Sequence, residues 1–263
     1  MAKSWEYYDE IASKYDYMYE EPYWKLYHAL TEKLIEDFIK KEDLKDLTVL
    51  DLGSGTGRWA IYFADNGAKK VYAYDPSVKM LEVAEMKAKE WGLDDKIKFI
   101  LGVAEKMPFD SECFDVVNAQ GDVLSYVQDL ESAMKEINRV LKKDGLLIGS
   151  VDSYYMFLND MVSNVDLGEL KKFEKNKKAL IGDLSVSKKL FPTRTFSVED
   201  IKNLESYGFE LLDIAGKVVF GPYVEKKLAR YLEKVLEIEH RYCRVKELIG
   251  RSEHIHFVLK KVQ

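Results

Sequence analysis

The chain has 263 residues, of which 47% are hydrophobic and 33% charged, which is enough to bury one substantial core and too few for two ordinary catalytic domains. We therefore expect a single domain, residues 1–263, that carries insertions. The formal net charge of -6 offers no basic face of the kind that nucleic-acid-binding modules carry, so we expect a small-molecule partner and no nucleic acid.

Short aliphatic or β-branched runs alternate with amphipathic helical stretches from residue 47 onward, which is typical of a parallel sheet covered by helices on both faces. The predicted strands are, in chain order, Leu47 to Leu52, Lys70 to Asp75, Lys96 to Leu101, Phe114 to Ala119, Leu146 to Val151, one strand within Phe209 to Phe220, and His254 to Lys261. The predicted helices are Gly57 to Asn66, a helix that begins at Pro76 and Ser77 and ends at Gly92, Asp129 to Leu141 before a Lys143-Asp144-Gly145 turn, and Val198 to Tyr207. These elements predict an α/β fold with a doubly wound, mostly parallel seven-stranded sheet.

Three segments lie outside this alternation. Residues 1–45 have a helical pattern rich in tyrosine and tryptophan, residues 152–195 interrupt the strand and helix pattern, and residues 221–250 predict one long amphipathic helix. Ligands of open α/β sheets bind beyond the carboxyl ends of the strands, so segments inserted after strands are placed to cover that crevice. We expect an N-terminal helical cap and two helical lid insertions over the substrate site.

The strongest local signal is the run VLDLGSGTGRWA at residues 49–60, which predicts a strand, a glycine loop and a helix. Gly53, Gly55 and Gly57 allow the backbone to turn sharply and to approach a ligand. The N-terminus of the following helix directs free N–H groups and a positive dipole end at that ligand. Asp75 ends the second strand, where its carboxylate can accept hydrogen bonds from both hydroxyls of a ribose. An adenosine-containing cofactor is therefore indicated.

The spacing and charge of the loop indicate which cofactor it holds. A dinucleotide-binding loop reads G-x-G-x-x-G and holds a pyrophosphate, whereas this loop reads G-x-G-x-G and has Arg58 where the third glycine would stand. Asp51 precedes the loop, where its carboxylate would repel a pyrophosphate and attract the ammonium group of a methionine moiety. An amino-acid zwitterion fits this loop better than a diphosphate does.

Four motifs in order resemble those of a known family. They are DLGSGTG, YAYDPSVKML, VAEKMPFDSECFDVV and LKKDGLLIGSV, which lie between residues 49 and 151. Together with WEYYDEIASKYDYMY at residues 5–19, they are similar to the class I S-adenosylmethionine-dependent methyltransferases, especially the group of quinone-biosynthesis and glycine/sarcosine methyltransferases. The resemblance implies a Rossmann-like methyltransferase fold, S-adenosyl-L-methionine as the cofactor, and methyl transfer to an acceptor.

The resemblance also assigns cofactor-binding residues. It implies that the methionine part is held by Asp51, Gly53, Ser54, Gly55 and Gly57, and the ribose by Asp75. It places Pro76, Ser77, Met80, Ala104 and Glu105 at the adenine, Tyr15 over the cofactor, and Gln120 where cofactor and acceptor meet. The family often has G-D-A-E where this chain has Gly102-Val103-Ala104-Glu105, so adenine recognition is expected to depend on Glu105 and backbone groups.

Methyl transfer from a sulfonium is an in-line displacement of an activated methyl group, so the protein mainly supplies orientation and electrostatics. An acceptor that loses a proton needs a base, and Asp122 and Tyr126, after the fourth strand, are our catalytic candidates. The acidic balance favours a small-molecule acceptor. An RNA or protein acceptor and a cofactor-binding protein without catalysis are alternatives, whereas the loop spacing and Asp51 disfavour a nicotinamide dehydrogenase. The sequence does not choose among carbon, nitrogen and oxygen acceptors or set the oligomeric state.

Three further patterns have simpler interpretations. His254 and His256 lie two apart on a predicted strand, but no cysteine or acidic residue is spaced to complete a metal site, so no metal is expected. The lysine run between residues 171 and 178 is interleaved with acidic residues and predicts a solvated helix face. Only Tyr15 among the N-terminal tyrosines is assigned a functional role, because aromatic side chains at helical spacing mostly pack.

The composition also indicates the cellular setting. With only Cys113 and Cys243 and no apolar signal-peptide core at the start, the chain shows no sign of an oxidising compartment, so we expect a cytoplasmic protein. No apolar run approaches the roughly 18 residues of a membrane helix, so no membrane span is expected. Lysine and glutamate are abundant and glutamine is scarce, a balance typical of a thermophile.

Overall fold

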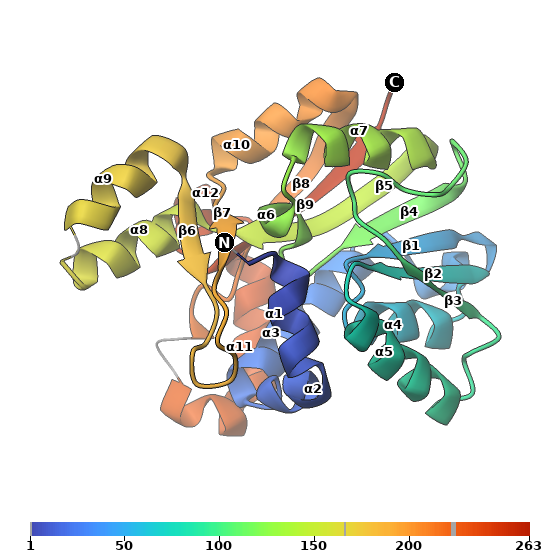
Figure 1. The fold of residues 1–263 in the computed structure, drawn as a ribbon, viewed down its shortest axis with the longest axis horizontal. Coiled ribbons are helices and arrows are strands. Elements are labelled where there is room, and N and C mark those ends of the chain that lie inside the picture. The colour runs from blue at the N-terminus through green and yellow to red at the C-terminus, as the bar shows by residue number, and fades with distance from the viewer. Residues whose placement is uncertain (1, 166, 222–224) are drawn as a thin grey trace.

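A seven-stranded sheet forms the centre of the computed structural model, which describes residues 2–165, 167–221 and 225–263 (Figure 1). Its strand order is β3-β2-β1-β4-β5-β9-β8, in which the first five strands are parallel and β9 is antiparallel to both neighbours. The bounds are β1 Thr48–Leu52, β2 Lys70–Asp75, β3 Ile97–Leu101, β4 Phe114–Ala119, β5 Leu141–Asp152, β8 Phe209–Lys217 and β9 His254–Lys261. The predicted doubly wound, mostly parallel sheet is confirmed.

Helices cover both faces of the sheet (Figure 1). Successive strand residues point to opposite faces, so Val49 of β1 joins a buried cluster with α4 and α5, whereas Leu50 joins a second cluster with α7 and α10. The bounds are α4 Arg58–Asp65, α5 Val78–Glu90, α7 Leu130–Val140 and α10 Val198–Lys202, followed by the 3-10 helix η3 Asn203–Tyr207. Because both faces are covered, the strands are apolar on both sides, and polar side chains collect at their carboxyl ends.

Two predicted elements differ from the structure over several residues. The predicted turn at residues 143–145 lies inside β5, as a bulge between the pairs Phe114–Leu141 and Val116–Leu146, and the strand begins at Leu141 rather than Leu146. The bulge allows the chain to pass directly from α7 into the sheet. The helix predicted for residues 198–207 is α-helical only to Lys202 and continues as a 3-10 helix.

The N-terminal segment is helical, as predicted, and is tied to the loops after β1 and β2. It contains α1 Ser4–Ile11, η1 Ala12–Lys14, α2 Tyr15–Met18, α3 Pro22–Glu36 and η2 Lys41–Asp46. Ser77 Oγ donates a hydrogen bond of 2.5 Å to Asp9, and Thr56 Oγ1 donates one of 2.6 Å to Asp16. Asp16 also forms an ion pair of 2.6 Å with Lys87 of α5. These contacts hold the segment over the edge of the sheet where ligands bind in this class of fold.

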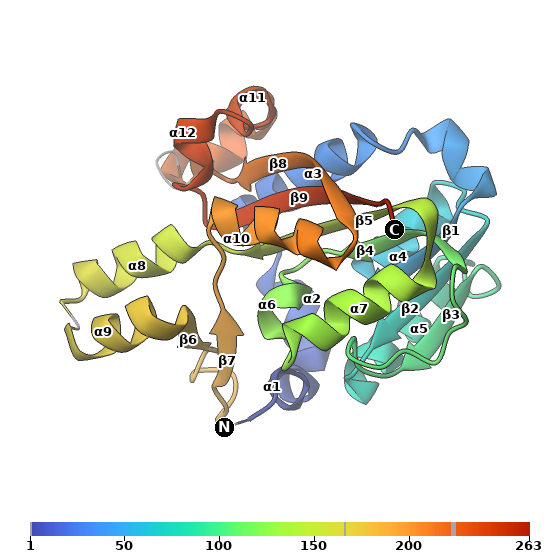
Figure 2. The same cartoon turned by 90° about the horizontal axis from the view of Figure 1, so that it is seen from above.

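The two insertions are not purely helical lids, so that part of the prediction is corrected. Residues 152–195 contain α8 Tyr154–Ser163 and α9 Leu167–Asn176, but also a two-stranded antiparallel sheet of β6 Lys178–Ile181 and β7 Phe191–Arg194. The two helices project from the body of the molecule (Figure 2). In residues 221–250 the predicted single helix is α11 Glu225–Tyr242, which is interrupted by non-helical backbone at Tyr231, and the short α12 Lys246–Ile249. Residues 222–224 lie outside the described residues.

Candidate functional site

A cavity of about 1300 Å³, including the open space at its mouth, lies at the carboxyl-terminal edge of β1 to β4. Its wall comes from the glycine loop after β1, the ends of β2, β3 and β4, the N-terminal helices, and the first residue of β9. This is the edge at which open α/β sheets bind ligands. Most of the predicted cofactor residues line it: Tyr15, Gly53, Ser54, Gly55, Asp75, Pro76, Met80, Ala104, Glu105 and Gln120.

A side chain is disfavoured at each of the three glycines of the loop, but for different structural reasons. All three have positive φ angles. A Cβ atom on Gly53 would lie 2.5 Å from Val123, at the start of the short helix α6 Val123–Tyr126, whereas a Cβ on Gly55 would meet nothing within 4 Å. Gly55 therefore leaves open space for a ligand. Gly57 does not line the cavity; its Cα faces α5, where a Cβ would lie 2.9 Å from Ala84, so the structure gives Gly57 a packing role.

Asp51 lies beneath the glycine loop rather than in the cavity wall. Its side chain is buried, and Asn118 donates a hydrogen bond of 2.8 Å to Oδ1. No residue in the described part of the chain partners Oδ2 of Asp51 or Oγ of Ser54, although both atoms are buried. Burial raises the pKa of Asp51 to about 7. These two unpartnered buried oxygens, one at the end of β1 and one in the glycine loop, fit a ligand that brings hydrogen-bond donors, such as an ammonium group.

Asp75 holds two loops together at the end of β2. Its Oδ2 accepts a hydrogen bond from the Gly55 N–H and its Oδ1 accepts one from the Ser77 N–H, both 2.8 Å long. Burial raises the pKa of Asp75 to about 6. Ser77 does not line the cavity, because its Oγ accepts from the Met80 N–H and caps α5. The carboxylate of Asp75 retains lone pairs that can accept ribose hydroxyls.

Glu105 is the adenine candidate, and its carboxylate also has a structural partner. Its Oε1 accepts hydrogen bonds from the backbone N–H groups of Gln128, at 2.7 Å, and Asp129, at 3.3 Å. The side chain therefore fastens the segment between α6 and α7 to the end of β3. Ala104 is buried beside it and leaves room in the cavity wall.

The comparisons with known proteins agree with this site. A family described as a methyltransferase domain matches residues 50–149. The chain is 27% identical to the tRNA 5-carboxymethoxyuridine methyltransferase of Escherichia coli O157:H7, over 97% of this chain and 96% of that one. It is 35% identical to the demethylmenaquinone methyltransferase of Chlorobaculum tepidum, over 52% of this chain and 54% of that one. In fold it resembles a Listeria monocytogenes protein assigned to the S-adenosylmethionine-dependent methyltransferases, with a TM-score of 0.65, 20% identity, and coverage of 90% of this chain and 98% of that one.

Residues 50–149 of the chain form a methyltransferase domain of the class I S-adenosylmethionine-dependent type. The chain is an enzyme of that kind, and its cofactor is S-adenosyl-L-methionine. The unpartnered oxygens beneath the glycine loop fit the amino-acid end of this cofactor. No helix within the described ranges is both long and apolar enough to cross a membrane.

Aromatic side chains form the other half of the methyltransferase's cavity. Besides Tyr15, the wall contains Tyr8, Tyr19, Trp24, Tyr27 and Tyr126. The rings of Tyr15 and Tyr19 have centroids 4.6 Å apart, and those of Tyr19 and Trp24 are 4.5 Å apart. Tyr15 is thus one of several aromatic residues in the wall, and a functional role for Tyr15 alone stays a prediction. Tyr8, Tyr15, Tyr19 and Tyr27 lie on or next to three separate helices, α1, α2 and α3, and the abundance of tyrosine in residues 1–45 was the signal that could have found them.

The lids predicted at residues 152–195 and 221–250 contribute no described residue to the cavity wall. Phe191 of β7 lies one layer behind it, with its ring 5.5 Å from Tyr8 and 5.4 Å from Tyr126. Helix α11 packs on α3, where Leu228 and Leu26 share one buried cluster. The covering role of these two segments stays a prediction, whereas the N-terminal segment lines the cavity directly.

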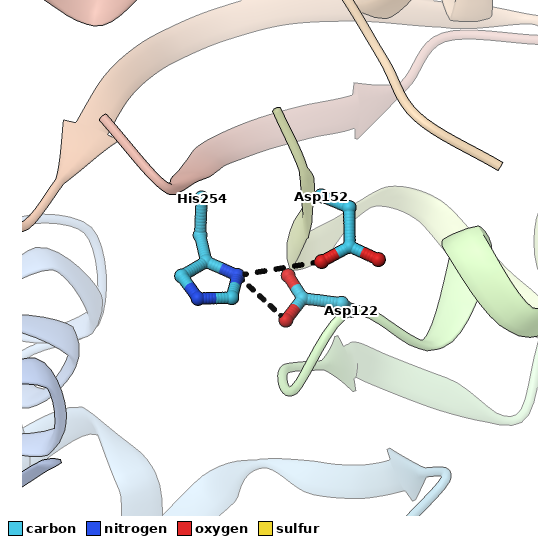
Figure 3. Close-up of side chains that lie close together, drawn as sticks. All are labelled: Asp122, Asp152 and His254. Atoms are coloured by element: carbon cyan, nitrogen blue, oxygen red, sulfur yellow. Dashed lines mark ion pairs between the residues drawn. The ribbon is translucent and has the colours of Figure 1, made fainter. Parts of the chain in front are cut away.

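A cluster of one histidine and two aspartates, which the sequence did not reveal, lies at the aromatic end of the cavity. His254 Nδ1 is 2.8 Å from Asp122 Oδ2 and 3.7 Å from Asp152 Oδ1 (Figure 3). The expectation that no acidic residue accompanies His254 is therefore wrong, because sequence spacing cannot show which strands are neighbours. His256 is not part of the cluster; its Nδ1 lies 3.3 Å from Gln120 Nε2.

Strand register builds this cluster. Asp152 at the end of β5 is paired with His254 at the start of β9, and His254 is paired with Lys217 at the end of β8. Paired residues of neighbouring strands point to the same face, so these three side chains form a row. Lys217 is fully buried; its Nζ lies 3.6 Å from the centroid of the Tyr27 ring and donates a hydrogen bond of 3.2 Å to Gln120. Burial lowers the pKa of Lys217 to about 7, against the attraction of Asp122.

Of the two predicted catalytic residues, Asp122 belongs to this cluster, whereas Tyr126 lies in the cavity wall outside it. Asp122 and Tyr126 both line the cavity. Burial acts to raise the pKa of Asp122, but the charge and hydrogen bonding of His254 outweigh it, so the carboxyl is held in its charged form with a lowered pKa. Burial raises the pKa of Tyr126 well above 10. A neutral phenol with so high a pKa is suited to orienting a ligand, and the role of Tyr126 as a base stays a prediction.

Proposed function

We propose that this enzyme methylates a small-molecule acceptor that is held in the aromatic half of the cavity. The observation that carries the proposal is the wall of this half, which combines Tyr8, Trp24 and Tyr27 of the N-terminal segment with His254 at the edge of the sheet. Asp9 and Asp16 fix that segment to the loops after β1 and β2, which form the other half of the cavity, here called the cofactor half. Such a wall encloses a compact ligand next to the cofactor.

The same proposal assigns the cofactor half. Asp51 and Ser54 would take the amino-acid end with their unpartnered oxygens, and Asp75 the ribose hydroxyls. Pro76, Met80, Ala104 and Glu105 would surround the adenine, with Tyr15 and Gln120 toward the acceptor. When bound, S-adenosylmethionine supplies a methyl group activated by its sulfonium. The chain's part is to align the acceptor and to exclude water, which can contribute roughly 7 to 11 kcal/mol to lowering the barrier.

A second candidate acceptor is an RNA base. It is favoured by one specific observation: the match to a tRNA methyltransferase covers almost the whole of both chains. Exposed Lys171 and Lys175 on the projecting helix α9 could contact phosphates, although Lys177 is already paired with Asp200. The net charge of -6 and the aromatic wall support the small molecule.

The experiment is methyl transfer from tritiated S-adenosylmethionine to defined acceptors. Phenols, quinols, amines and unfractionated tRNA are offered separately to the purified enzyme, and transferred label is measured in each. Label in a small acceptor and none in tRNA is expected. Label in tRNA alone would replace the small-molecule proposal with the RNA alternative. The Asp75→Asn variant, which disturbs the cofactor half, serves as the control for label that does not come from this site.

A further inference from the structure

We propose that His254 is the general base of the reaction, that it takes the proton of an aromatic hydroxyl group, and that Asp122 positions it. This inference rests on the proposed small-molecule function and names the class of acceptor. Asp122 and Tyr126, which follow the fourth strand, were our sequence-based candidates for this role, whereas His254 stands at the beginning of the last strand.

The orientation of the imidazole ring carries the proposal. Nδ1 faces two carboxylates, at 2.8 Å from Asp122 and 3.7 Å from Asp152, and the second ring nitrogen points away from both (Figure 3). The contact with Asp122 is close but is not aligned as a hydrogen bond, so it acts through charge. A lone pair on Nδ1 would face two carboxyl groups whereas an N–H there is attracted to them, so a neutral ring in this position carries its hydrogen on Nδ1 and leaves Nε2 as an acceptor. His254 lines the cavity, and no described residue is hydrogen-bonded to Nε2. A lone pair is thereby directed at the space for the acceptor.

Asp122 is held where it can position the ring. It has a left-handed backbone conformation, with φ of 64°, and Ser150 Oγ accepts hydrogen bonds from the N–H groups of Gly121 and Asp122. Asp152 is fixed by Thr193, whose Oγ1 donates a hydrogen bond of 2.5 Å. The imidazole is therefore flanked by two carboxylates that are oriented before any acceptor enters.

The charged and titratable groups that face His254 come from four elements. They are Asp122 after β4, Asp152 on β5, Lys217 on β8 and Tyr27 on α3. Burial acts to lower the pKa of His254, but the attraction and hydrogen bonding of Asp122 and the charge of Asp152 outweigh it and raise the pKa. A raised pKa makes the ring a stronger base once it is neutral.

The surroundings favour a neutral aromatic hydroxyl over other acceptors. The ring of Tyr27 lies 5.0 Å from His254 and that of Trp24 lies 6.5 Å away, which are distances at which aromatic rings pack. Asp122 stays charged and repels an acceptor that arrives as an anion, so the hydroxyl must enter protonated. Burial and the charge of Asp122 raise the pKa of Asp152 to about 7, so Asp152 adds to this repulsion only when it is ionised.

The step balances without a further reactant. The hydroxyl proton passes to Nε2 of His254, and Asp122 stabilises the imidazolium. The oxygen's electron pair forms the new bond to the methyl carbon, and the pair of the broken carbon–sulfur bond stays on sulfur, which neutralises the sulfonium. The imidazolium then releases its proton to solvent.

The test uses a phenol whose ionisation is visible. Enzyme saturated with S-adenosylhomocysteine, which has no methyl group to transfer, is titrated with 4-nitrophenol at several pH values, and the absorbance of the phenolate is followed. The bound probe is expected to ionise with an apparent pKa lowered by about one unit or more relative to the free probe. His254→Gln should abolish this lowering and Asp122→Asn should reduce it. His240→Gln, which changes a histidine paired with Asp37 on the surface, should leave it unchanged.

Each other outcome overturns the proposal. A wild-type enzyme that binds S-adenosylhomocysteine but not 4-nitrophenol, or binds it without lowering its pKa, excludes the aromatic hydroxyl. If the His254→Gln variant still lowers the apparent pKa of the bound probe, His254 is excluded as the general base. If EDTA abolishes the lowering of the probe's pKa and Mg²⁺ restores it, the cluster of Asp122, Asp152 and His254 binds a metal ion instead. If His254→Gln and His254→Asn both fail to bind S-adenosylhomocysteine, the wild-type titration alone decides. Failure of the proposed function is separate, because it appears as label in tRNA only.

Discussion

Asp152 and His254 stand opposite each other in the register of β5 and β9, and this pairing brings a histidine to the carboxyl-terminal edge of a parallel sheet. Because β9 runs antiparallel to β5, its first residue lies at the same edge as the last residues of the parallel strands. The site therefore combines residues that are more than one hundred positions apart in the chain, such as Asp122 and His254.

The first prediction concerns Asp75. Asp75→Asn keeps the size of the side chain but removes the charge that accepts the N–H groups of Gly55 and Ser77. Losing one charge-assisted hydrogen bond costs about 1.5 to 3 kcal/mol, so the Kd for S-adenosylhomocysteine should rise roughly 10- to 100-fold in calorimetric titration. Asp144→Asn, which changes an exposed partner of Lys260, is the control. An unchanged Kd in Asp75→Asn would exclude Asp75 from the cofactor half.

The second prediction separates two glycines of one loop. Gly57→Ala introduces a Cβ 2.9 Å from Ala84 at a φ of 81°, so it should lower the free energy of unfolding in urea by about 2 to 4 kcal/mol. Gly55→Ala meets open space and carries only the cost of its positive φ, about 1 to 2 kcal/mol, but should weaken S-adenosylhomocysteine binding more. Adding Ala84→Gly should partly rescue Gly57→Ala. Equal losses of stability in the two single variants would contradict the packing role of Gly57.

The third prediction concerns pH and Asp51. Its pKa is about 7 in the folded protein against 3.8 ordinarily, so between these values the folded chain holds a proton that the unfolded chain has released. The stability contributed by protonated Asp51 is complete below about pH 4 and is lost as the pH rises toward 7. The free energy of unfolding should therefore fall between pH 5 and 8 by about 2 kcal/mol more in wild type than in Asp51→Asn. Parallel pH profiles in urea unfolding would refute this.

The fourth prediction concerns Asp16, whose contacts hold the N-terminal segment against the glycine loop and α5. Asp16→Asn weakens the contacts with Thr56 and Lys87, so the segment should be cut faster in limited proteolysis, and S-adenosylhomocysteine should dissociate several-fold faster. Glu82→Gln breaks an exposed ion pair with Lys79 on the same helix and should change neither rate. If Asp16→Asn behaves like Glu82→Gln, the ion pair does not secure the segment.

Local patterns predicted most of the sheet. β2, β4 and β9 have the predicted bounds, because short apolar runs between turn residues are read from neighbouring positions alone. The β6–β7 pair escaped prediction, since both strands are short, alternate weakly and lie in a segment without a periodic pattern. The glycine loop and Asp75 could also be predicted, because loop and strand end are brought together by a single parallel pairing of β1 and β2.

The sequence by itself thus determined the fold class, the cofactor and the strand ends that line the cavity. Only the tertiary structure decided that His254 joins Asp122 and Asp152, that Lys217 lies in the same row, and that Gly57 serves packing. The physical reason is that periodicity tells which face a side chain points to, whereas the neighbour it meets depends on strand order and register, which are set by pairing between distant segments of the chain.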